Sequence, residues 1–450
     1  MEQTKVIINK NLLLLLCFTG FLLNYLTYFP GFMSPDSFDQ FGQALRGEYD
    51  DWHPPVMAYV WRLMNKIEEG PELMLAMQLA LLWLSCYLFC ISIRSSVWRV
   101  VVFLAFYSAP FIHNFAGWII KDMIMAFSWL LAIAILFSII HRNGGEDGGR
   151  RSKWLVIPVG LLLLYGCWLR YNAIVALLPL SVALVWIFWP EKTRKTKILY
   201  SMSFVLLVYF GQPLFNKYFL KAHVNYTEAQ IYFHDLAAIF VKTGDNVFPD
   251  YLYENPEFDT AYIRTHYDPL DVTALLWNPD HKTLLHYNKE TVNSMKSAWF
   301  KLLKEYPMMY IKHRVYIYKY FLALEKKKDL QYYYIWMHPN DYGFKVYETT
   351  LYRKYANSIS AQKNKIYFQT WFWIFLNILL LPLCFLVRDR NYRLLYFTVA
   401  LSGFLYTAPQ IIVANYVTDF RYIYWSCFAC FASVIIFLAD RMPRRLSAGN

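Results

Sequence analysis

Charged residues are scarce in this sequence. They make up 17% of its 450 residues, whereas hydrophobic residues make up 57% and aromatic residues 20%, a composition that is too apolar for a soluble protein. Charges are also nearly absent from the middles of the long apolar runs, where proton- and ion-coupled transporters usually carry them. The sequence therefore predicts an all-α polytopic membrane protein and argues against a transporter.

The polar loops contain no cysteine, and all seven cysteines lie in apolar runs. This placement gives no readable disulfide framework or zinc site and is typical of small buried side chains. No close His/Cys pattern has the spacing of metal ligands either. We therefore predict no metal site and no certain cofactor, and leave a divalent metal open. The glycines of "NGGEDGG" form no Walker pattern, so this stretch is interpreted as a cytoplasmic linker.

Ten apolar runs have about the length that crosses a bilayer, near 20 residues. They cover 11–30, 73–93, 100–117, 123–140, 154–169, 171–189, 198–214, 366–387, 394–413 and 420–439. If the N-terminus is cytoplasmic, each even-numbered run should end at a basic segment. Five such segments follow: Arg94 with Arg99, "HRNGGEDGGRRSK", "PEKTRKTK", "RDRNYR" and "DRMPRR".

Both termini are therefore expected in the cytoplasm. Run 11–30 is expected to stay as a span, because no small-residue cleavage site follows it. Much of the net charge of +12 lies in short loops and tails, so we assign it to helix orientation and not to nucleic-acid binding.

Three parts of the chain follow from this count. Residues 1–214 form a seven-span membrane module with an external loop at 31–72, residues 215–365 form an external domain, and residues 366–450 form a three-span module. In the external domain, 223–280 carries ten acidic and two basic residues, and 281–329 carries four acidic and eleven basic residues. A basic helix broken at Pro307 is predicted. It either packs on the acidic half or rests on anionic headgroups and helps to admit substrate.

Acidic and basic residues recur at the outer ends of the predicted spans. Asp36 follows the first span, Lys121 and Asp122 open the fourth, Arg170 lies between the fifth and sixth, and Asp419 and Arg421 open the tenth. Charges near hydrocarbon need a partner or water. Any single Arg or Lys here also fits an interfacial anchor, but together the residues indicate chemistry at the lipid headgroup level.

The first external loop supports this interpretation. "SPDSFDQFGQALRG" begins with helix-capping residues and an early proline, and its apolar residues have helical spacing. A second helix is expected after the two prolines of "DWHPP". Both should lie along the membrane surface and hold Asp36 and His53 there.

These motifs, in this order, resemble the GT-C superfamily of integral membrane glycosyltransferases. "SPDS", "DWHPP", "KD", "RYN" and "DFRY" carry the resemblance over about 1–215 and 366–440. The superfamily includes protein mannosyltransferases, the lipid A aminoarabinose transferase and bacterial O-antigen-modifying glucosyltransferases. "HDLAAI" and "YPMMYIKHR" resemble bacterial members less specifically.

The resemblance implies an inverting transfer of a sugar from an undecaprenyl-phosphate-type donor to a glycan or glycolipid acceptor. It implies that Asp36 matches the first-loop catalytic acid, Asp122 the second acidic position, and His53 the residue ahead of the two prolines. Many relatives have two adjacent acidic residues where this chain has Ser37 after Asp36. This leaves open whether Asp39 or Asp122 shares the catalytic role of Asp36.

The residue types suggest roles for the remaining candidates. A carboxylate can act as general base, which we assign to Asp36, and cations can stabilise a leaving phosphate. The candidate cations and neighbours are Arg421, Arg170, Lys121, His53 and Asp419. Trp52, Trp118, Tyr171 and Tyr422 could stack on sugar or prenyl groups or form an ordinary interfacial belt. His234, Asp235 and Arg314 are expected to contact the site from above, and "YYYIW" at 332–336 fits a carbohydrate platform or core.

The leading hypothesis is a GT-C type hexosyltransferase of the bacterial inner membrane, with a periplasmic active site, membrane lipids around it and an envelope glycan such as O-antigen as acceptor. The alternatives are a flippase or exporter of polyprenyl-linked glycan, a transferase acting on lipid A or protein, and a membrane phosphatase or lipid hydrolase. An exporter predicts a polar path through the bilayer, and a hydrolase predicts a nucleophile or a dense His/Asp metal set.

Overall fold

The regular elements of this chain are all helices, within the residues that the structure describes. The structure is a computed structural model that describes residues 9–142, 153–254, 258–276, 288–325, 330–414, 416–417 and 419–442. Two of the five basic segments that orient the predicted spans lie partly outside these residues. They are "HRNGGEDGGRRSK", of which residues 143–152 are not described, and "DRMPRR", which is not described after residue 442.

Among the described residues, seven helical stretches are long and apolar enough to cross a membrane, which confirms the prediction of a multi-pass α-helical membrane protein. They are Lys10–Tyr28, Glu72–Ser92, Lys121–His141, Tyr171–Phe188, Arg194–Leu220, Arg390–Val413 and Phe420–Arg441. Three further apolar helices, Ser96–Ser108, Lys153–Trp168 and Thr370–Leu386, coincide with the other predicted spans but are shorter. The predicted number of ten therefore depends on these three.

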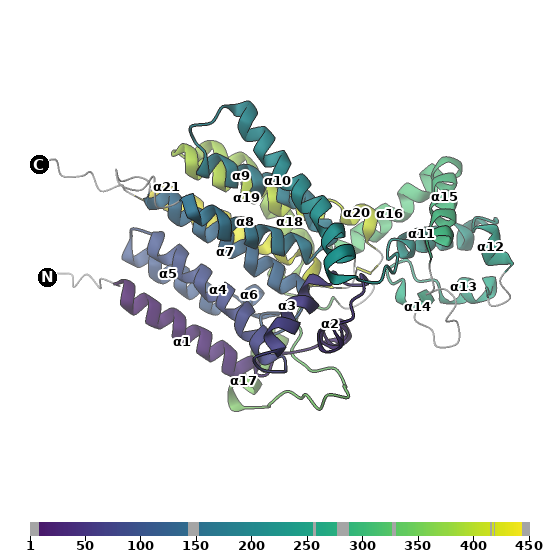
Figure 1. Ribbon diagram of the computed structural model, residues 1–450, viewed down its shortest axis with the longest axis horizontal. Helices are drawn as coiled ribbons and strands as arrows, with labels where there is room; N and C mark the ends of the chain where they lie inside the picture. Colours follow the sequence, from purple (N-terminus) through teal and green to yellow (C-terminus); the bar gives the residue numbers. More distant parts are fainter. Residues whose placement is uncertain are drawn as a thin grey trace, which may run out of the picture.

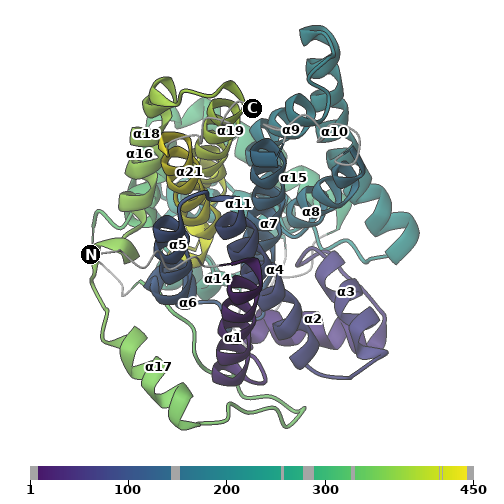
Figure 2. The same cartoon turned by 90° about the vertical axis from the view of Figure 1, so that its left-hand side faces the viewer.

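Helix α7 (Lys121–Arg142) lies in the middle of the bundle (Figure 2) and is covered on every side. In its most apolar window, 94% of the residues are buried. Its sequence is apolar around its whole circumference, as a buried central helix requires. The charged residues of α7 are confined to its two ends.

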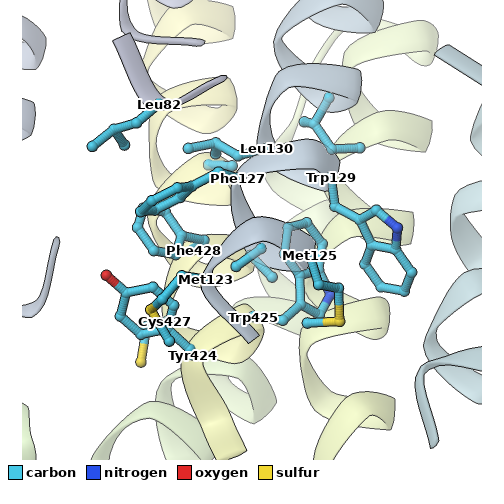
Figure 3. Packing of buried hydrophobic residues seen from close by; sticks show 14 of the residues in the cluster. Leu82, Met123, Met125, Phe127, Trp129, Leu130, Tyr424, Trp425, Cys427 and Phe428 are labelled. Carbon is cyan, nitrogen blue, oxygen red and sulfur yellow. The ribbon is translucent and has the colours of Figure 1, made fainter. Parts of the chain in front are cut away.

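Helix α21 (Tyr424–Arg441) packs against α7 through large aromatic side chains (Figure 3). The rings of Trp129 and Trp425 meet edge to face with centroids 5.1 Å apart, and those of Phe127 and Phe428 are 5.4 Å apart. Such pairs add about 0.5–1.5 kcal/mol each beyond area burial. The packing fixes the starts of the two helices relative to one another.

The loop after α1 forms the two short helices predicted for it, α2 (Pro35–Arg46) and α3 (Val56–Asn65). Ser34 caps α2: its hydroxyl accepts the Ser37 N–H, and the Ser37 hydroxyl accepts the Ser34 N–H. Proline at the first helical position suits this start, because its missing N–H would have no partner there. The cap fixes the first turn of α2 and with it the position of Asp36.

A separate helical group extends from one end of the bundle (Figure 1). We call this end of the bundle the site end. The helical group contains α11 (Ala229–Thr243), α15 (Lys289–Glu305) and α16 (Pro307–Phe321), with its own apolar core around Phe233, Leu236 and Leu302. The basic helix predicted here is broken at Pro307, as expected, and α15 packs on α11 of the acidic half. The first turn of α1 and the last turn of α21 lie at the opposite end of the bundle.

The other described helices complete the chain. They are α1 (Lys10–Tyr28), α4 (Glu72–Ser92), α5 (Ser96–Ser108), α6 (Pro110–His113), α8 (Val156–Trp168), α9 (Ile174–Phe188), α10 (Arg194–Leu214), α12 (Asp250–Tyr253), α13 (Thr260–His266), α14 (Thr273–Leu276), α17 (Thr350–Ser360), α18 (Thr370–Leu383), α19 (Arg390–Thr407) and α20 (Gln410–Val413). Short helical turns stand at 153–155, 171–173, 215–220, 366–368, 384–386 and 420–423.

Candidate active site

Short extended stretches from distant parts of the chain lie side by side at the site end. Phe32 bridges to Trp118, Met33 to Met337, and Gln331 to Asp419. Each connection includes backbone hydrogen bonds, such as that from the Ile119 N–H to the Phe32 carbonyl at 2.9 Å. These bridges set the positions of the charged residues that follow them by a few residues.

Asp36 lies in the first turn of α2, where the helix dipole stabilises a carboxylate. Its neighbour Ser37 is buried and donates its hydroxyl to the Ile119 carbonyl at 2.7 Å. Ser37 thereby ties α2 to the segment that leads into α7. An ionised acidic side chain at 37 has no proton to donate and could not make this bond.

Arg421 connects two carboxylates. Its Nη1 donates to Asp36 Oδ2 at 3.2 Å, and its Nε lies 2.7 Å from Asp419 Oδ2. The guanidinium also lies over the rings of Trp118 and Tyr422, at 4.9 and 5.2 Å from their centroids. The aromatic faces and carboxylates hold Arg421 in one orientation.

His53 connects Lys121 to Asp36. The Lys121 ammonium lies 2.5 Å from His53 Nδ1, and His53 Nε2 lies 3.7 Å from Asp36 Oδ1. An ammonium can only donate, so Nδ1 accepts and Nε2 carries the proton that faces the carboxylate. Burial and the charge of Lys121 lower the pKa of His53 to about 3, so the ring is neutral at physiological pH.

Asp122 and Arg170 form a second, deeper ion pair. Arg170 Nε lies 3.2 Å from Asp122 Oδ1, and the Asp122 side chain has no exposed surface. The Arg170 guanidinium lies 5.1 Å from the Tyr422 ring centroid. The Tyr422 ring thus contacts both guanidinium groups and connects the two ion pairs.

The pKa values of Asp36 and Asp419 are shifted in opposite directions. Burial alone would raise the pKa of Asp36, but the positive charges of Arg421 and Lys121 outweigh it and hold this pKa well below its ordinary value. Burial raises the pKa of Asp419 to about 6, against the effect of Arg421. The cluster thus contains as many carboxyl groups, those of Asp36, Asp122 and Asp419, as cationic groups, those of Lys121, Arg170 and Arg421.

A cavity of about 1010 Å³ opens beside this cluster. Lys121, Arg170 and Tyr422 line it, and mostly apolar residues of α9, α10 and α20 form a wall. Val175 and Tyr209 of that wall are 39% and 56% exposed, so the cavity reaches the outer surface of the helix bundle. Trp52, Tyr171 and Asp51 also line it.

Asp36, with 32% of its side chain exposed, is the most accessible acid of the charged cluster. Asp39 lies one turn away and shares the Gln43 amide with Asp50, at 2.9 and 3.1 Å. Burial and the neighbouring Asp50 raise the pKa of Asp39 to about 6. No contact joins Asp39 to the cations of the site among the residues that the structure describes.

His234 and Arg314 do not line the cavity. Both are buried in the helical group beside the bundle, around Asp235, and Arg314 reaches only the backbone near the site, where it donates to the Ala414 carbonyl at 2.7 Å. Their expected contact with substrate stays a prediction that this geometry does not favour.

One site residue was not singled out from the sequence. Tyr334 stacks on Trp118 with centroids 4.2 Å apart and donates its hydroxyl to the Met33 carbonyl. It supports the ring over which Arg421 lies. The "YYYIW" motif gave a signal for this tyrosine but did not distinguish it from its neighbours; Tyr332 is buried as well, and only Trp336 is exposed.

No protein-family model matches this chain, and neither the curated proteins nor the solved structures include a match.

Proposed function

We propose that this chain is a GT-C type glycosyltransferase that moves a sugar from a polyprenyl-phosphate donor to an envelope glycan such as O-antigen. One observation carries the proposal: a partly exposed carboxylate, Asp36, belongs to an ion cluster that lines a largely apolar cavity through Lys121 and Arg170. Such a cavity suits a ligand that is apolar at one end and anionic at the other. A polyprenyl-phosphate sugar has this chemistry.

The donor phosphate would bind between Lys121, Arg170 and Arg421, with its prenyl chain along α9 and α10. Guanidinium groups bind phosphate oxygens bidentately. The cluster contains as many carboxyl groups as cationic groups, so the phosphate competes with Asp36 for Arg421. Donor binding would therefore release Asp36 and raise its pKa toward that of an ordinary carboxylate.

The reaction would then be a single displacement. The acceptor hydroxyl oxygen attacks the anomeric carbon, the bond from that carbon to the phosphate oxygen breaks, and Asp36 takes the hydroxyl proton. Polyprenyl phosphate leaves with the bonding electrons, and the three cations stabilise its added charge. Asp122 holds Arg170, and His53 directs an N–H at Asp36, so both position groups that act on the substrate.

The distribution of charge favours this function over an exporter. In the described apolar helices, Asp, Glu, Lys and Arg occur only in first and last turns, which leaves the helix centres without a charged path. The proposed location is the periplasmic side of the bacterial inner membrane, where a lipid-linked donor and an envelope glycan meet.

Mass spectrometry of envelope glycans tests the proposal. Cells with the native chain should carry one sugar more per repeat, or per glycolipid, than cells without it. Cells with the Asp36→Asn chain should resemble those without it, whereas cells with the exposed control Asp341→Asn should resemble the native strain. Identical glycan and glycolipid masses with and without the chain would contradict a glycosyltransferase function.

A further inference from the structure

Two histidines and an aspartate meet inside the helical group beside the bundle, away from the cavity. His234 and Asp235 come from α11 and His313 from α16, and all three side chains are buried. Their ligand atoms lie within 4.8 Å of one another. His313 Nε2 is 3.3 Å from Asp235 Oδ1, close to the separation of about 3.4 Å between ligands of a tetrahedral zinc ion at 2.1 Å.

The second nitrogen of each imidazole is already engaged. His234 Nε2 lies 3.0 Å from the Asp268 carbonyl, and a carbonyl only accepts, so Nε2 carries the proton. His234 Nδ1 therefore presents a lone pair to the cluster. His313 Nδ1 lies 3.4 Å from the Tyr267 hydroxyl. Metal-binding histidines are commonly oriented by such a partner on the opposite nitrogen.

The atoms that face the centre make no hydrogen bond of good geometry within the described part of the chain, although two of them, Asp235 Oδ1 and His313 Nε2, lie 3.3 Å apart. The three atoms are His234 Nδ1, Asp235 Oδ1 and His313 Nε2. Buried polar atoms without partners are rare and costly, by about 1–3 kcal/mol each. Three such atoms around one point indicate a ligand that supplies their missing interactions.

We propose that His234, Asp235 and His313 bind a zinc ion. The ligand atoms would be His234 Nδ1, His313 Nε2 and Asp235 Oδ1, with water in a fourth position. Two imidazoles and a carboxylate form a ligand set that zinc accepts.

Arg314 places a positive charge close to the proposed zinc ion. Its guanidinium and the Trp299 indole both donate to Asp235 Oδ2, which leaves Oδ1 for the ion. The carboxylate would thus bridge Arg314 and zinc, and Arg314 would act as a positioning residue. Because Arg314 also donates to the Ala414 carbonyl, the ion would fasten α11 to α16 and both to the bundle.

Metal content of the purified full-length chain tests this inference without any activity assay. The chain, freed of affinity tags, is stripped with chelator, dialysed against limiting Zn²⁺ and analysed by elemental mass spectrometry. We expect about one zinc per chain in the native protein, and binding at least tenfold weaker in His234→Asn and His313→Asn. The matched control His266→Asn, which changes an exposed histidine on α13, should bind as the native protein does.

Two further measurements keep the test decisive if a variant fails to fold. In the native protein, chelation should lower the thermal midpoint and Zn²⁺ should restore it, and Co²⁺ should give the visible spectrum of a four-coordinate site. Absence of binding to the native chain would overturn the proposal, as would zinc binding retained by both histidine variants. Neither result bears on sugar transfer, because the proposed zinc site is separate from the donor cavity.

Discussion

The buried pair of Asp122 and Arg170 gives the sharpest energetic prediction. Asp122 has no exposed surface and Arg170 is 13% exposed, with 3.2 Å between Arg170 Nε and Asp122 Oδ1. Removing one partner of a buried ion pair leaves the other charge uncompensated and costs about 3–5 kcal/mol. Asp122→Asn and Arg170→Gln should therefore each destabilise the chain by about this amount.

The double variant should lose much less than the sum of the two. Replacing both charges leaves no buried unpaired charge, and such replacements are often close to neutral. The two substitutions should therefore show a coupling energy of about 3 kcal/mol. Unfolding entropy is about 2.1 cal/mol/K per residue, so a loss of about 4 kcal/mol lowers the midpoint by about 4 °C, or more if the spans stay helical.

Thermal unfolding of the four proteins in detergent measures this cycle, and sugar transfer separates stability from catalysis. The double variant should regain most of the native midpoint but stay inactive, because it lacks the Arg170 charge. Additive midpoint shifts would refute the ion-pair account. Native turnover in the double variant would refute the role of Arg170 in phosphate binding.

Three further predictions follow from the same contacts. Arg421→Lys keeps the charge but loses the second donor arm and the stacking over Trp118. Donor affinity, measured by titration, and turnover, measured by product formation, should therefore each fall at least about tenfold. Unchanged values would contradict the bidentate role of Arg421. Ser37→Ala removes the hydrogen bond to the Ile119 carbonyl and should lower the stability by about 1 kcal/mol in thermal unfolding. Ser37→Asp should lower the stability further. A Ser37→Asp chain as stable as the native chain would show that this position tolerates a second acid. The pKa of Asp39 is raised to about 6 from an ordinary 3.8, so its stabilising contribution is present below pH 3.8 and is lost as the pH rises through 6. Asp39→Asn should therefore stabilise the chain by about 1 kcal/mol at pH 8, after allowance for solvent screening, and by about half as much at pH 5. Equal thermal shifts at both pH values would contradict the raised pKa.

Much of the fold could be predicted because helical spans leave strong patterns in the sequence. The apolar runs coincide with helices, and the serine, proline and aspartate of "SPDS" predict the start of α2. Span length was predicted less well: Ser96–Ser108 and Thr370–Leu386 are shorter than the expected 20 residues, since run length does not show where turns and prolines end a helix.

The charged cluster was predicted only as a set of residues at one depth. Sequence alone could not show that Arg421 contacts Asp36, 385 positions away, because this contact depends on isolated β-bridges between loops. It also could not show that Asp122 is fully buried while Asp36 is accessible. These differences arise from the packing of α2, α7 and α21 against one another.

The cluster of His234, Asp235 and His313, the proposed zinc site, was not predicted from the sequence for a related reason. The search for close ligand spacing finds sites within one segment, whereas these ligands come from two helices brought together by the core of the helical group. Only the neighbouring pairs "HD" and "HR" were visible, and they carry no ligand spacing of their own.

Turnover of the Asp36→Asn chain tests the central claim most directly. The native, Asp36→Asn and Asp341→Asn chains are reconstituted in lipid nanodiscs with a polyprenyl-phosphate sugar and acceptor, and both donor binding and release of polyprenyl phosphate are measured. Loss of a general base costs about 10²–10⁴-fold in rate, so Asp36→Asn should bind donor at least as tightly as the native chain but release product at least about 100-fold more slowly. Near-native turnover of Asp36→Asn, at the level of the Asp341→Asn control, would contradict the account.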